Sequence, residues 1–174
     1  MAKTLKVGII GASAGRGWAK VSHVPAVQKL AGLELAAVAT NSRKSADEAA
    51  EAFGVTGYVD AEELFRDPSI DIVTVAVKVP DHRALLHGAI AAGKHVYCEW
   101  PLGRDLAEAE ELADAARAAG VKAAIGLQTR ANPYARRARD LIASGAIGRV
   151  LSARVLSTTM AFGPNVEAAM AFGE

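Results

Sequence analysis

Short runs of apolar residues alternate along the chain with longer alanine-rich segments in which polar residues recur at helical spacing. Most of these runs are apolar nearly throughout, as expected of strands that are covered on both faces of a sheet. Strands that alternate with amphipathic helices form a parallel sheet with helices on its faces. We therefore predict strands at Leu5–Ile10, Leu33–Ala39, Ile72–Val77, His95–Cys98 and Val121–Ile125.

Capping residues and glycines between the runs indicate where the helices begin and end. Ser45-Ala46-Asp47-Glu48 has the spacing of a capping box, in which the Ser45 hydroxyl and the Glu48 carboxylate bind free amides at a helix start. Later helices are expected to begin at Asp60, at Asp81 and at Asn132-Pro133. Glycine adopts the left-handed conformation that ends a helix, and it stands at the expected ends as Gly54, Gly93, Gly120 and Gly145.

Composition and charge limit the classes of protein that the sequence fits. The 174 residues are 51% hydrophobic and 22% charged, which is typical of a globular protein. Lys and Arg number 20 against 19 Asp and Glu. No excess of positive charge therefore favours direct binding to nucleic acid or to a membrane surface. The amino end lacks the apolar core of a signal peptide, and no run reaches the roughly 20 apolar residues of a membrane span. We expect a cytoplasmic protein.

The single cysteine and the histidines indicate no further chemistry. Cys98 lies in a predicted strand, where a thiol behaves as a small buried hydrophobe. His23, His87 and His95 have no ligand spacing with Cys98 or with an acid cluster, so no metal site is expected.

A glycine-rich turn, residues 11–17, follows the first predicted strand and precedes a predicted helix over Ala19–Leu30. Glycines at such a turn let main-chain amides approach a pyrophosphate at the helix start. The turn departs from the pattern G-x-G-x-x-G, because Ser13 takes the second glycine position and Gly17 comes one residue late. An ordinary glycine-rich connection is the alternative. We predict an α/β fold with a doubly wound parallel sheet of Rossmann type that binds a nicotinamide dinucleotide.

The end of the second predicted strand bears on which dinucleotide is preferred. The sequence there is Thr40-Asn41-Ser42-Arg43-Lys44, at a position where an NAD-binding protein places an acid against the ribose hydroxyls. Hydroxyl groups with two cations suit the 2′-phosphate of NADP instead. A solvated helix start is the alternative. We expect NADP as the cofactor, with NAD as the second possibility.

Two further segments resemble a known family. Residues 92–102 read AGKHVYCEWPL, which is similar to the A-G-K-H-V-x-x-E-K-P-L motif of the glucose-fructose oxidoreductase, inositol dehydrogenase and MocA family. Residues 145–150 read GAIGRV, which is similar to the G-x-I-G-x-[VI] segment at the start of the family's second domain. The resemblance covers nearly the whole chain, and a typical member is about twice as long, as a two-domain chain must be.

The resemblance implies an oxidoreductase that moves hydride to or from a sugar, cyclitol or related alcohol. The motif lysine, with its implied role in handling a proton, is replaced by Trp100, which exchanges no proton at neutral pH. Lys78, at the end of the run Ile72–Val77, is the candidate substitute, and a surface lysine is the alternative. His82 resembles a family histidine that follows a turn, with a structural role at a helix start as the alternative.

A different branch of the family gives a second functional hypothesis. The turn with Ser13 and Gly17-Trp18, together with Glu99-Trp100-Pro101, resembles the branch that contains the fungal galactose-pathway repressor, which binds dinucleotide as a regulator. The alternative function is therefore a dinucleotide-sensing regulatory protein without turnover.

The predicted organisation is a dinucleotide-binding domain at residues 1–126 and the first segment of an incomplete substrate or oligomerisation domain at residues 127–174. A further strand is expected at Arg149–Thr159, followed by an apolar tail that favours a homo-oligomer. Lys78 is the catalytic candidate. The predicted cofactor-binding residues are Gly11, Ser13, Ala14, Arg16, Gly17, Trp18, Thr40, Ser42, Arg43, Lys44, Val77, Lys78, Pro80, His82, Glu99, Trp100 and Gln128.

Overall fold

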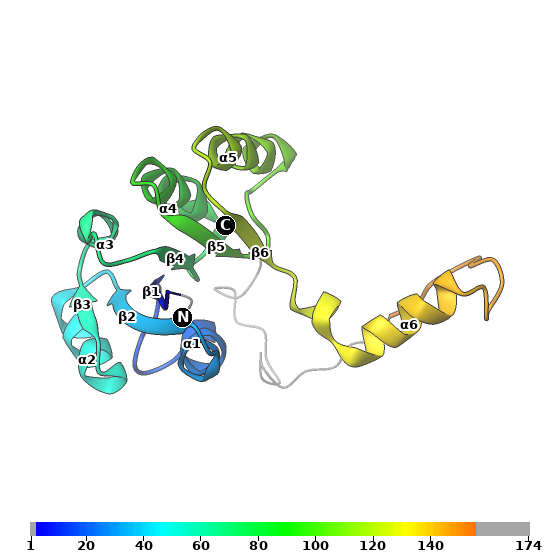
Figure 1. The fold of residues 1–174 in the computed structure, drawn as a ribbon, viewed down its shortest axis with the longest axis horizontal. Helices are drawn as coiled ribbons and strands as arrows, with labels where there is room; N and C mark the ends of the chain where they lie inside the picture. Colours follow the sequence, from blue (N-terminus) through cyan, green and yellow to red (C-terminus); the bar gives the residue numbers. More distant parts are fainter. Residues whose placement is uncertain (1–2, 156–174) are drawn as a thin grey trace, which may run out of the picture. The chain divides into compact units, whose positions relative to one another are not determined.

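The computed structural model describes residues 3–155, which divide into two units, the first ending at Gln128 and the second beginning at Thr129. The first unit contains a six-stranded sheet in the order β3-β2-β1-β4-β5-β6 (Figure 1). All neighbouring strands are parallel. This is the strand order of a doubly wound dinucleotide-binding sheet, so the predicted fold class is confirmed.

The strands are close to those that the sequence predicts. They are β1 (Leu5–Ile10), β2 (Leu33–Ala39), β3 (Thr56–Tyr58), β4 (Ile72–Val75), β5 (His95–Glu99) and β6 (Ala123–Gly126). Strand β3 is not among the predicted strands, because it is short and has no apolar run. Its central residue is Gly57, where an added Cβ would lie 2.5 Å from the Ala46 carbonyl oxygen of the helix above it. The close approach of that helix explains the glycine.

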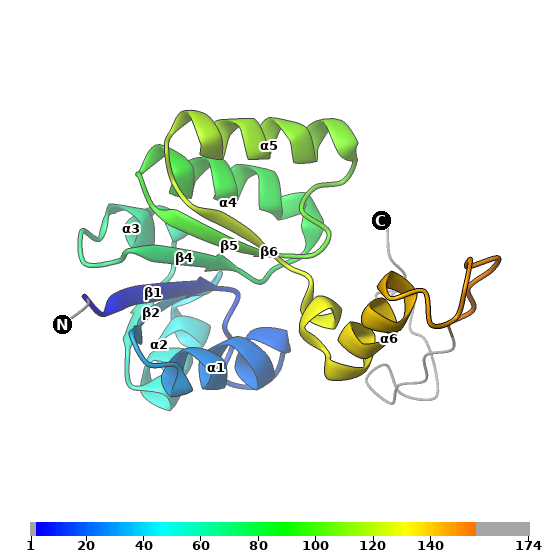
Figure 2. The same ribbon diagram turned by 45° about the vertical axis from the view of Figure 1, so that its right-hand side comes forward.

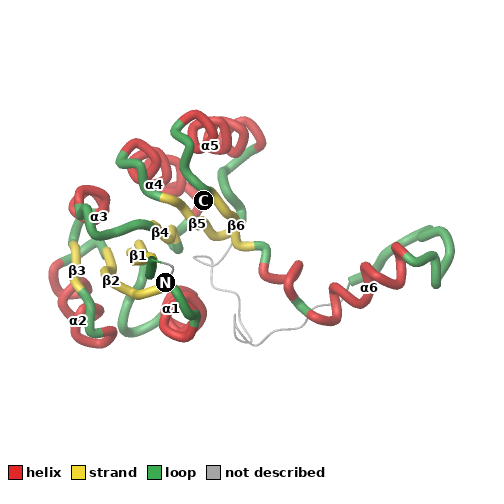
Figure 3. The backbone as a smooth tube through the Cα atoms, viewed as in Figure 1, coloured by secondary structure: helices red, strands yellow, loops and turns green. Residues whose placement is uncertain are grey.

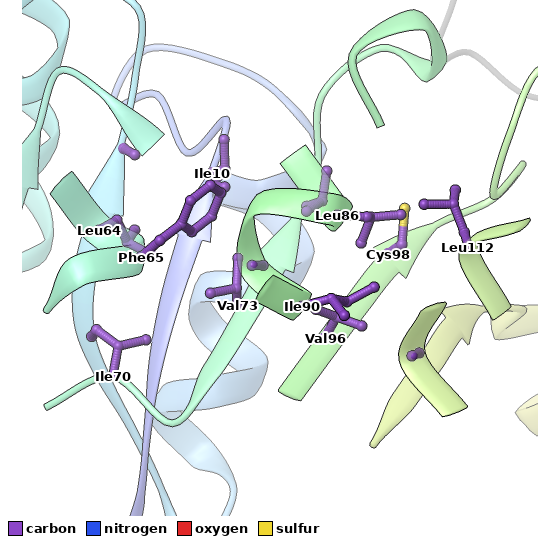
Figure 4. Close-up of a cluster of buried hydrophobic side chains, with 14 of the residues drawn as sticks. Ile10, Leu64, Phe65, Ile70, Val73, Leu86, Ile90, Val96, Cys98 and Leu112 are labelled. Atoms are coloured by element: carbon purple, nitrogen blue, oxygen red, sulfur yellow. The ribbon is translucent and has the colours of Figure 1, made fainter. Parts of the chain in front are cut away.

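Helices cover both faces of the sheet (Figure 2). One face packs against η1 (Ala19–His23), α1 (Val24–Lys29) and α2 (Arg43–Phe53), with a core that includes Val7, Ile9, Val24, Val38 and Ala49. The other face packs against α3 (Ala61–Arg66), α4 (Val79–Ala91) and α5 (Leu106–Ala118). Its core includes Phe65, Val73, Leu86, Cys98 and Leu112 (Figure 4). Burial on both faces is why the strands are apolar throughout.

The predicted ends of the helices are confirmed, but two predicted starts are wrong. Gly54, Gly93 and Gly120 have positive φ angles of 68°, 72° and 68°, as predicted. The capping residue of α2 is Ser42, whose side chain accepts from the Ser45 amide at 3.2 Å, so Ser45 lies inside the first turn.

The start of α4 and the path after the glycine turn also differ from prediction. Helix α4 begins at Val79, before Asp81, because Pro80 fits the first helical turn without a lost hydrogen bond. The helix predicted over Ala19–Leu30 divides into the wider π-turn η1 and the α-helix α1. Asp60 caps α3 as predicted, accepting from the Glu62 amide at 2.9 Å.

After β6 the chain continues through η2 (Gln128–Ala131) and α6 (Pro133–Ala143) (Figure 3). Asn132 caps α6 as predicted, accepting from the Tyr134 amide at 2.9 Å. The strand predicted at Arg149–Thr159 is wrong for residues 149–155, which pair with no strand among the described residues. The remainder of that prediction, residues 156–159, and the apolar tail lie outside the described residues.

Candidate functional site

A cleft of about 730 Å³ lies at the carboxyl ends of the strands, between the turn after β1, the start of α2 and the start of α4. In open α/β sheets, ligands bind at this edge where the strand order reverses. The cleft is lined by the predicted cofactor-binding residues Gly11, Ser13, Arg16, Gly17, Thr40, Val77 and Pro80. Four further lining residues are not among the predicted cofactor-binding residues: Asn41, Ser45, Asp60 and Asp81.

The glycine turn has the shape that an anionic group requires. Gly11 has a φ of 92°, and an added Cβ there would lie 2.7 Å from the Ala76 carbonyl oxygen beyond β4. Gly17 has a φ of 107° and no atom within 4 Å of an added Cβ, so it faces open space. Within residues 3–155, the amides of Ser13, Ala14, Arg16 and Gly17 donate to no main-chain carbonyl. Unpaired amides on a concave turn are the donors that bind phosphate oxygens.

Ala14 and Trp18 are the other two predicted residues of this region. Ala14 is half-buried within it, and Trp18, which follows Gly17, is 51% exposed at the start of η1. The Lys20 ammonium donates to the Gly15 carbonyl at 3.4 Å, so a cation also lies against the turn. The turn therefore combines free amides with positive charge, which favours a negatively charged ligand.

A cluster of hydroxyl groups lies at the end of β2. The Thr40 and Ser45 hydroxyl oxygens are 2.7 Å apart, and the Ser42 and Ser45 hydroxyl oxygens are 2.8 Å apart. The predicted cations are on the first turn of α2 beside this cluster, where Arg43 lies 3.6 Å from Asp47 and Lys44 lies 3.9 Å from Glu48. Arg43 borders a separate open groove with Tyr58 and Asp67, so the cleft itself offers hydroxyls at this end.

Glu99 and Gln128, both predicted, are brought together at the carboxyl ends of β5 and β6. Gln128 Nε2 donates to the two Glu99 carboxylate oxygens at 3.1 and 2.9 Å. His23 Nε2 lies 2.8 Å from Glu99 Oε1, and the His23 ring packs edge-on against Tyr97 with centroids 5.4 Å apart. Sequence reasoning missed His23 because its partner is distant along the chain and no local motif links them. The Gln128 amide therefore orients the carboxylate, while the buried His23 Nε2 lies beside it without a hydrogen bond to any described residue.

Lys78, Trp100 and His82 lie in three different environments. Lys78 is exposed at the residue before α4, next to Val77 of the cleft wall. Trp100 follows Glu99 at the end of β5 and is 63% exposed. His82 is 1% exposed, with both ring nitrogens against main-chain carbonyl oxygens. An effect of His82 on a bound cofactor therefore has to pass through the segments that it contacts.

The Cys98 thiol is buried in β5, and burial raises its pKa to about 12. At pH 8 the thiolate fraction is then roughly a thousandfold below that of an ordinary thiol. We expect iodoacetamide at pH 8 to alkylate the folded chain at least about 100-fold more slowly than the urea-unfolded chain. Mass spectrometry over time gives both rates. Equal rates would contradict the buried, inert thiol.

Neither a membrane span nor a metal cluster is found among residues 3–155. Their helices are all too short or too polar to cross a bilayer. Their His, Cys, Asp and Glu side chains form no group of three that could hold a metal ion.

The strand order, the glycine turn with its free amides and the cleft above it together define a dinucleotide-binding domain. The model of the oxidoreductase family with an NAD-binding Rossmann fold, GFO_IDH_MocA, matches residues 5–127. The chain belongs to this family, as the sequence motifs predict.

Curated relatives include enzymes and regulators. Dehydrogenase aclE of Aspergillus oryzae is 38% identical in an alignment of length 168 that covers 91% of this chain and 45% of the relative. The galactose/lactose metabolism regulatory protein GAL80 of Kluyveromyces lactis is 29% identical over 164 residues, 88% of this chain and 36% of the relative. The chain thus spans less than half the length of these relatives.

Solved structures agree with the family. An NAD-binding oxidoreductase from Klebsiella pneumoniae has a TM-score of 0.74 and 35% identity, covering 84% of this chain and 40% of its own. A scyllo-inositol dehydrogenase from Lactobacillus casei, with bound NAD(H) and scyllo-inositol, has a TM-score of 0.74 and 28% identity over 84% of this chain and 43% of its own. Family membership and these neighbours support a nicotinamide dinucleotide as the cofactor of this domain.

Proposed function

We propose that the chain is the cofactor-binding part of an NAD(P)-dependent oxidoreductase that acts on a sugar, cyclitol or related alcohol. The observation that carries the proposal is the cleft at the carboxyl edge of the sheet, bordered by a glycine turn in which the amides of Ser13, Ala14, Arg16 and Gly17 are free. The substrate class rests on relatives such as the scyllo-inositol dehydrogenase. Isothermal titration calorimetry of this chain with NADP⁺ and NAD⁺ tests the cofactor site, and absence of binding to both would overturn it.

Residues that line the cleft, together with Ser42, Glu99 and Trp100 outside its lining, suit the two ends of a dinucleotide. We place the pyrophosphate on the amides of residues 13–17, the adenosine ribose at the hydroxyl cluster of Thr40, Ser42 and Ser45, and the nicotinamide near Val77, Glu99 and Trp100. When bound, the nicotinamide accepts or donates the hydride. The protein binds and orients it: Glu99, oriented by Gln128, presents an acceptor for ribose or amide hydrogens, and Trp100 offers a flat apolar surface.

We further propose that NADP is preferred over NAD. No acid stands at residues 40–45, and the Asp60 carboxylate that lines the cleft is engaged in capping α3. Arg43 is 65% exposed in a surface pair with Asp47. Such pairs contribute little, so its guanidinium turns toward a 2′-phosphate at small cost. A 3-ketoreductase from Actinomadura kijaniata, 27% identical, was solved with NADP.

Replacing Arg43 by alanine is expected to weaken NADP⁺ binding by about 1–3 kcal/mol, the size of a lost charged hydrogen bond, and to leave NAD⁺ binding unchanged. Calorimetric titration of both cofactors measures the two effects. Arg117→Ala is the matched control, because Arg117 is also an exposed arginine paired along its helix, with Asp114 on α5. Tighter binding of NAD⁺ than NADP⁺ by the unaltered chain would contradict the assigned preference.

For the chemical step we propose Lys78 as the group that handles the substrate proton. Trp100 carries no exchangeable proton at neutral pH, whereas the Lys78 ammonium stands beside the cleft wall at Val77. In the oxidation of an alcohol, Lys78 in its neutral form would accept the hydroxyl proton, and its ammonium would return a proton in the reverse reaction. The variant Lys78→Ala, made in a chain that includes the substrate domain, tests this role: unchanged turnover would exclude it.

The second candidate function is a regulator that binds dinucleotide without turnover. Trp100 in place of the motif lysine and the similarity to GAL80 favour it. The two functions differ in one measurement, because both predict dinucleotide binding and only the enzyme reduces or oxidises a substrate.

The remaining features of the whole protein are also proposals. We propose that residues 127–174 begin a substrate or oligomerisation domain, that the protein is a homo-oligomer and that it acts in the cytoplasm. The length of the relatives supports a second domain. Analytical ultracentrifugation of the chain measures the oligomeric state.

A further inference from the structure

His82 lies in the first turn of α4, where its ring is enclosed by main-chain oxygens. Nδ1 is 3.0 Å from the Pro101 carbonyl oxygen and 3.3 Å from that of Leu102. On the other side of the ring, Nε2 is 3.1 Å from the Val77 carbonyl oxygen. The ring is 1% exposed, and the buried Cys98 sulfur is 3.3 Å from Nδ1. One side chain therefore joins the segment after β4 to the segment after β5.

Both segments belong to the nicotinamide end of the proposed site. Val77 lines the cleft, and Pro101 follows Glu99 and Trp100. Because the Trp100 side chain is 63% exposed, packing holds it weakly and the main chain on either side sets its position. A contact that fixes the Pro101 carbonyl also fixes the end of β5 from which Glu99 and Trp100 extend.

An apolar side chain could fill the same space but could not make the same connection. Carbonyl oxygens only accept hydrogen bonds, so they need a donor, and a buried carbonyl without one is destabilised. The imidazole offers one N–H in either neutral tautomer, to the Pro101 or to the Val77 oxygen, and two when it is protonated, whereas a leucine offers none. The segments would then be free to move apart, because no donor would join them.

We propose that His82 is a positioning residue for the nicotinamide half of the cofactor. It keeps Val77, in the wall of the cleft, at a fixed position relative to the Glu99-Trp100-Pro101 segment, and it does not touch the cofactor. The inference rests on the proposed function. It also limits the effect to one half of the site, since the hydroxyl cluster at Thr40, Ser42 and Ser45 has no contact with the His82 ring.

The test compares whole dinucleotides with fragments that lack the nicotinamide half. Calorimetry measures binding of NADP⁺ and NAD⁺, and of adenosine 2′,5′-bisphosphate and ADP, to the unaltered chain and to His82→Leu. We expect His82→Leu to weaken dinucleotide binding about tenfold, the worth of a lost hydrogen bond, and to change fragment binding less than about twofold. His82→Asn keeps a donor on a shorter side chain, so we expect a smaller loss of about threefold.

The control is His87→Leu on the same helix. His87 lies 2.9 Å from Glu111 and makes no hydrogen bond to the segment after β5, so binding of all four ligands is expected to stay unchanged. Hydrogen–deuterium exchange gives a readout without any ligand. In His82→Leu, exchange is expected to rise at residues 99–103 and 77–78 and to stay constant in β1 and α2.

Each outcome decides between defined alternatives. Equal weakening of dinucleotides and fragments would make His82 a general support of the fold and overturn the proposal, as would no weakening at all. If His82→Leu does not fold, His82→Asn decides, and a loss that is not confined to the dinucleotides overturns the proposal. If the unaltered chain binds none of the four ligands, the proposed function fails instead, and the exchange measurement still tests whether His82 holds the two segments.

Discussion

Replacing Gly17 by valine is expected to weaken dinucleotide binding by about 10²–10⁴-fold while the chain still folds. Gly17 has a φ of 107°, faces open space and lines the cleft. The new side chain would occupy the place of the pyrophosphate, and losing about two charge-assisted hydrogen bonds from the turn amides accounts for that range. The strained backbone costs about 1–3 kcal/mol of unfolding free energy. Calorimetry measures the binding and thermal unfolding measures the strain.

The matched control is Gly120→Val. Gly120 has a φ of 68° at the end of α5, and an added Cβ there also meets no atom within 4 Å. This variant carries a similar backbone strain far from the cleft, so it should lose stability and retain binding. Binding by Gly17→Val that matches the control would place the cofactor somewhere other than the glycine turn.

The second large effect is on catalysis: the 174-residue chain alone is expected to bind dinucleotide and to show no turnover on polyols or aldoses. It spans 45% of its dehydrogenase relative, and the described part of the second unit contains no sheet on which to place an alcohol. Substrate positioning is worth about 7–11 kcal/mol, and general acid-base catalysis about 10²–10⁴-fold. Without the first and with only the proposed Lys78 for the second, the rate is expected to fall below detection.

Absorbance of the reduced cofactor at fixed enzyme concentration measures this rate over a panel of polyols and aldoses. A chain extended through the substrate domain is the comparison. Turnover by the short chain would refute the expectation. Turnover by the extended chain alone would support the enzyme, and no turnover by either would favour the regulator.

The sequence predicts the central strands well because burial on both faces leaves a clear signal. The bounds of β1 and β2 agree with prediction to the residue. Edge strand β3 was missed because it is held by pairing with β2 through Ala37 and Thr56, a tertiary contact that leaves no apolar run. The start of α2 was misplaced because Ser42 and Ser45 are both capable caps. Only the three-dimensional path shows that the Ser42 hydroxyl accepts a hydrogen bond from the Ser45 amide.

The candidate site divides in the same way. The glycine turn is local in sequence, so its residues could be predicted, and Gly11, Ser13, Arg16 and Gly17 line the cleft. The pairing of His23 with Glu99 joins distant parts of the chain and had no sequence signal. His82 was predicted from a motif, but its burial beneath the cleft wall could not be.

The walls of the cleft come from segments that follow separate strands, among them Gly11 after β1, Thr40 after β2 and Val77 after β4. A ligand that contacts all of these segments joins them, so it opposes local unfolding that would separate one strand from the others. Binding to the folded state alone raises its stability by about 2.7 kcal/mol at a ligand concentration 100-fold above Kd. In a chain of this size, each kcal/mol of added stability raises the melting temperature by about 2–4 °C. Thermal shift can therefore rank cofactors and their analogues for this chain before any substrate is known.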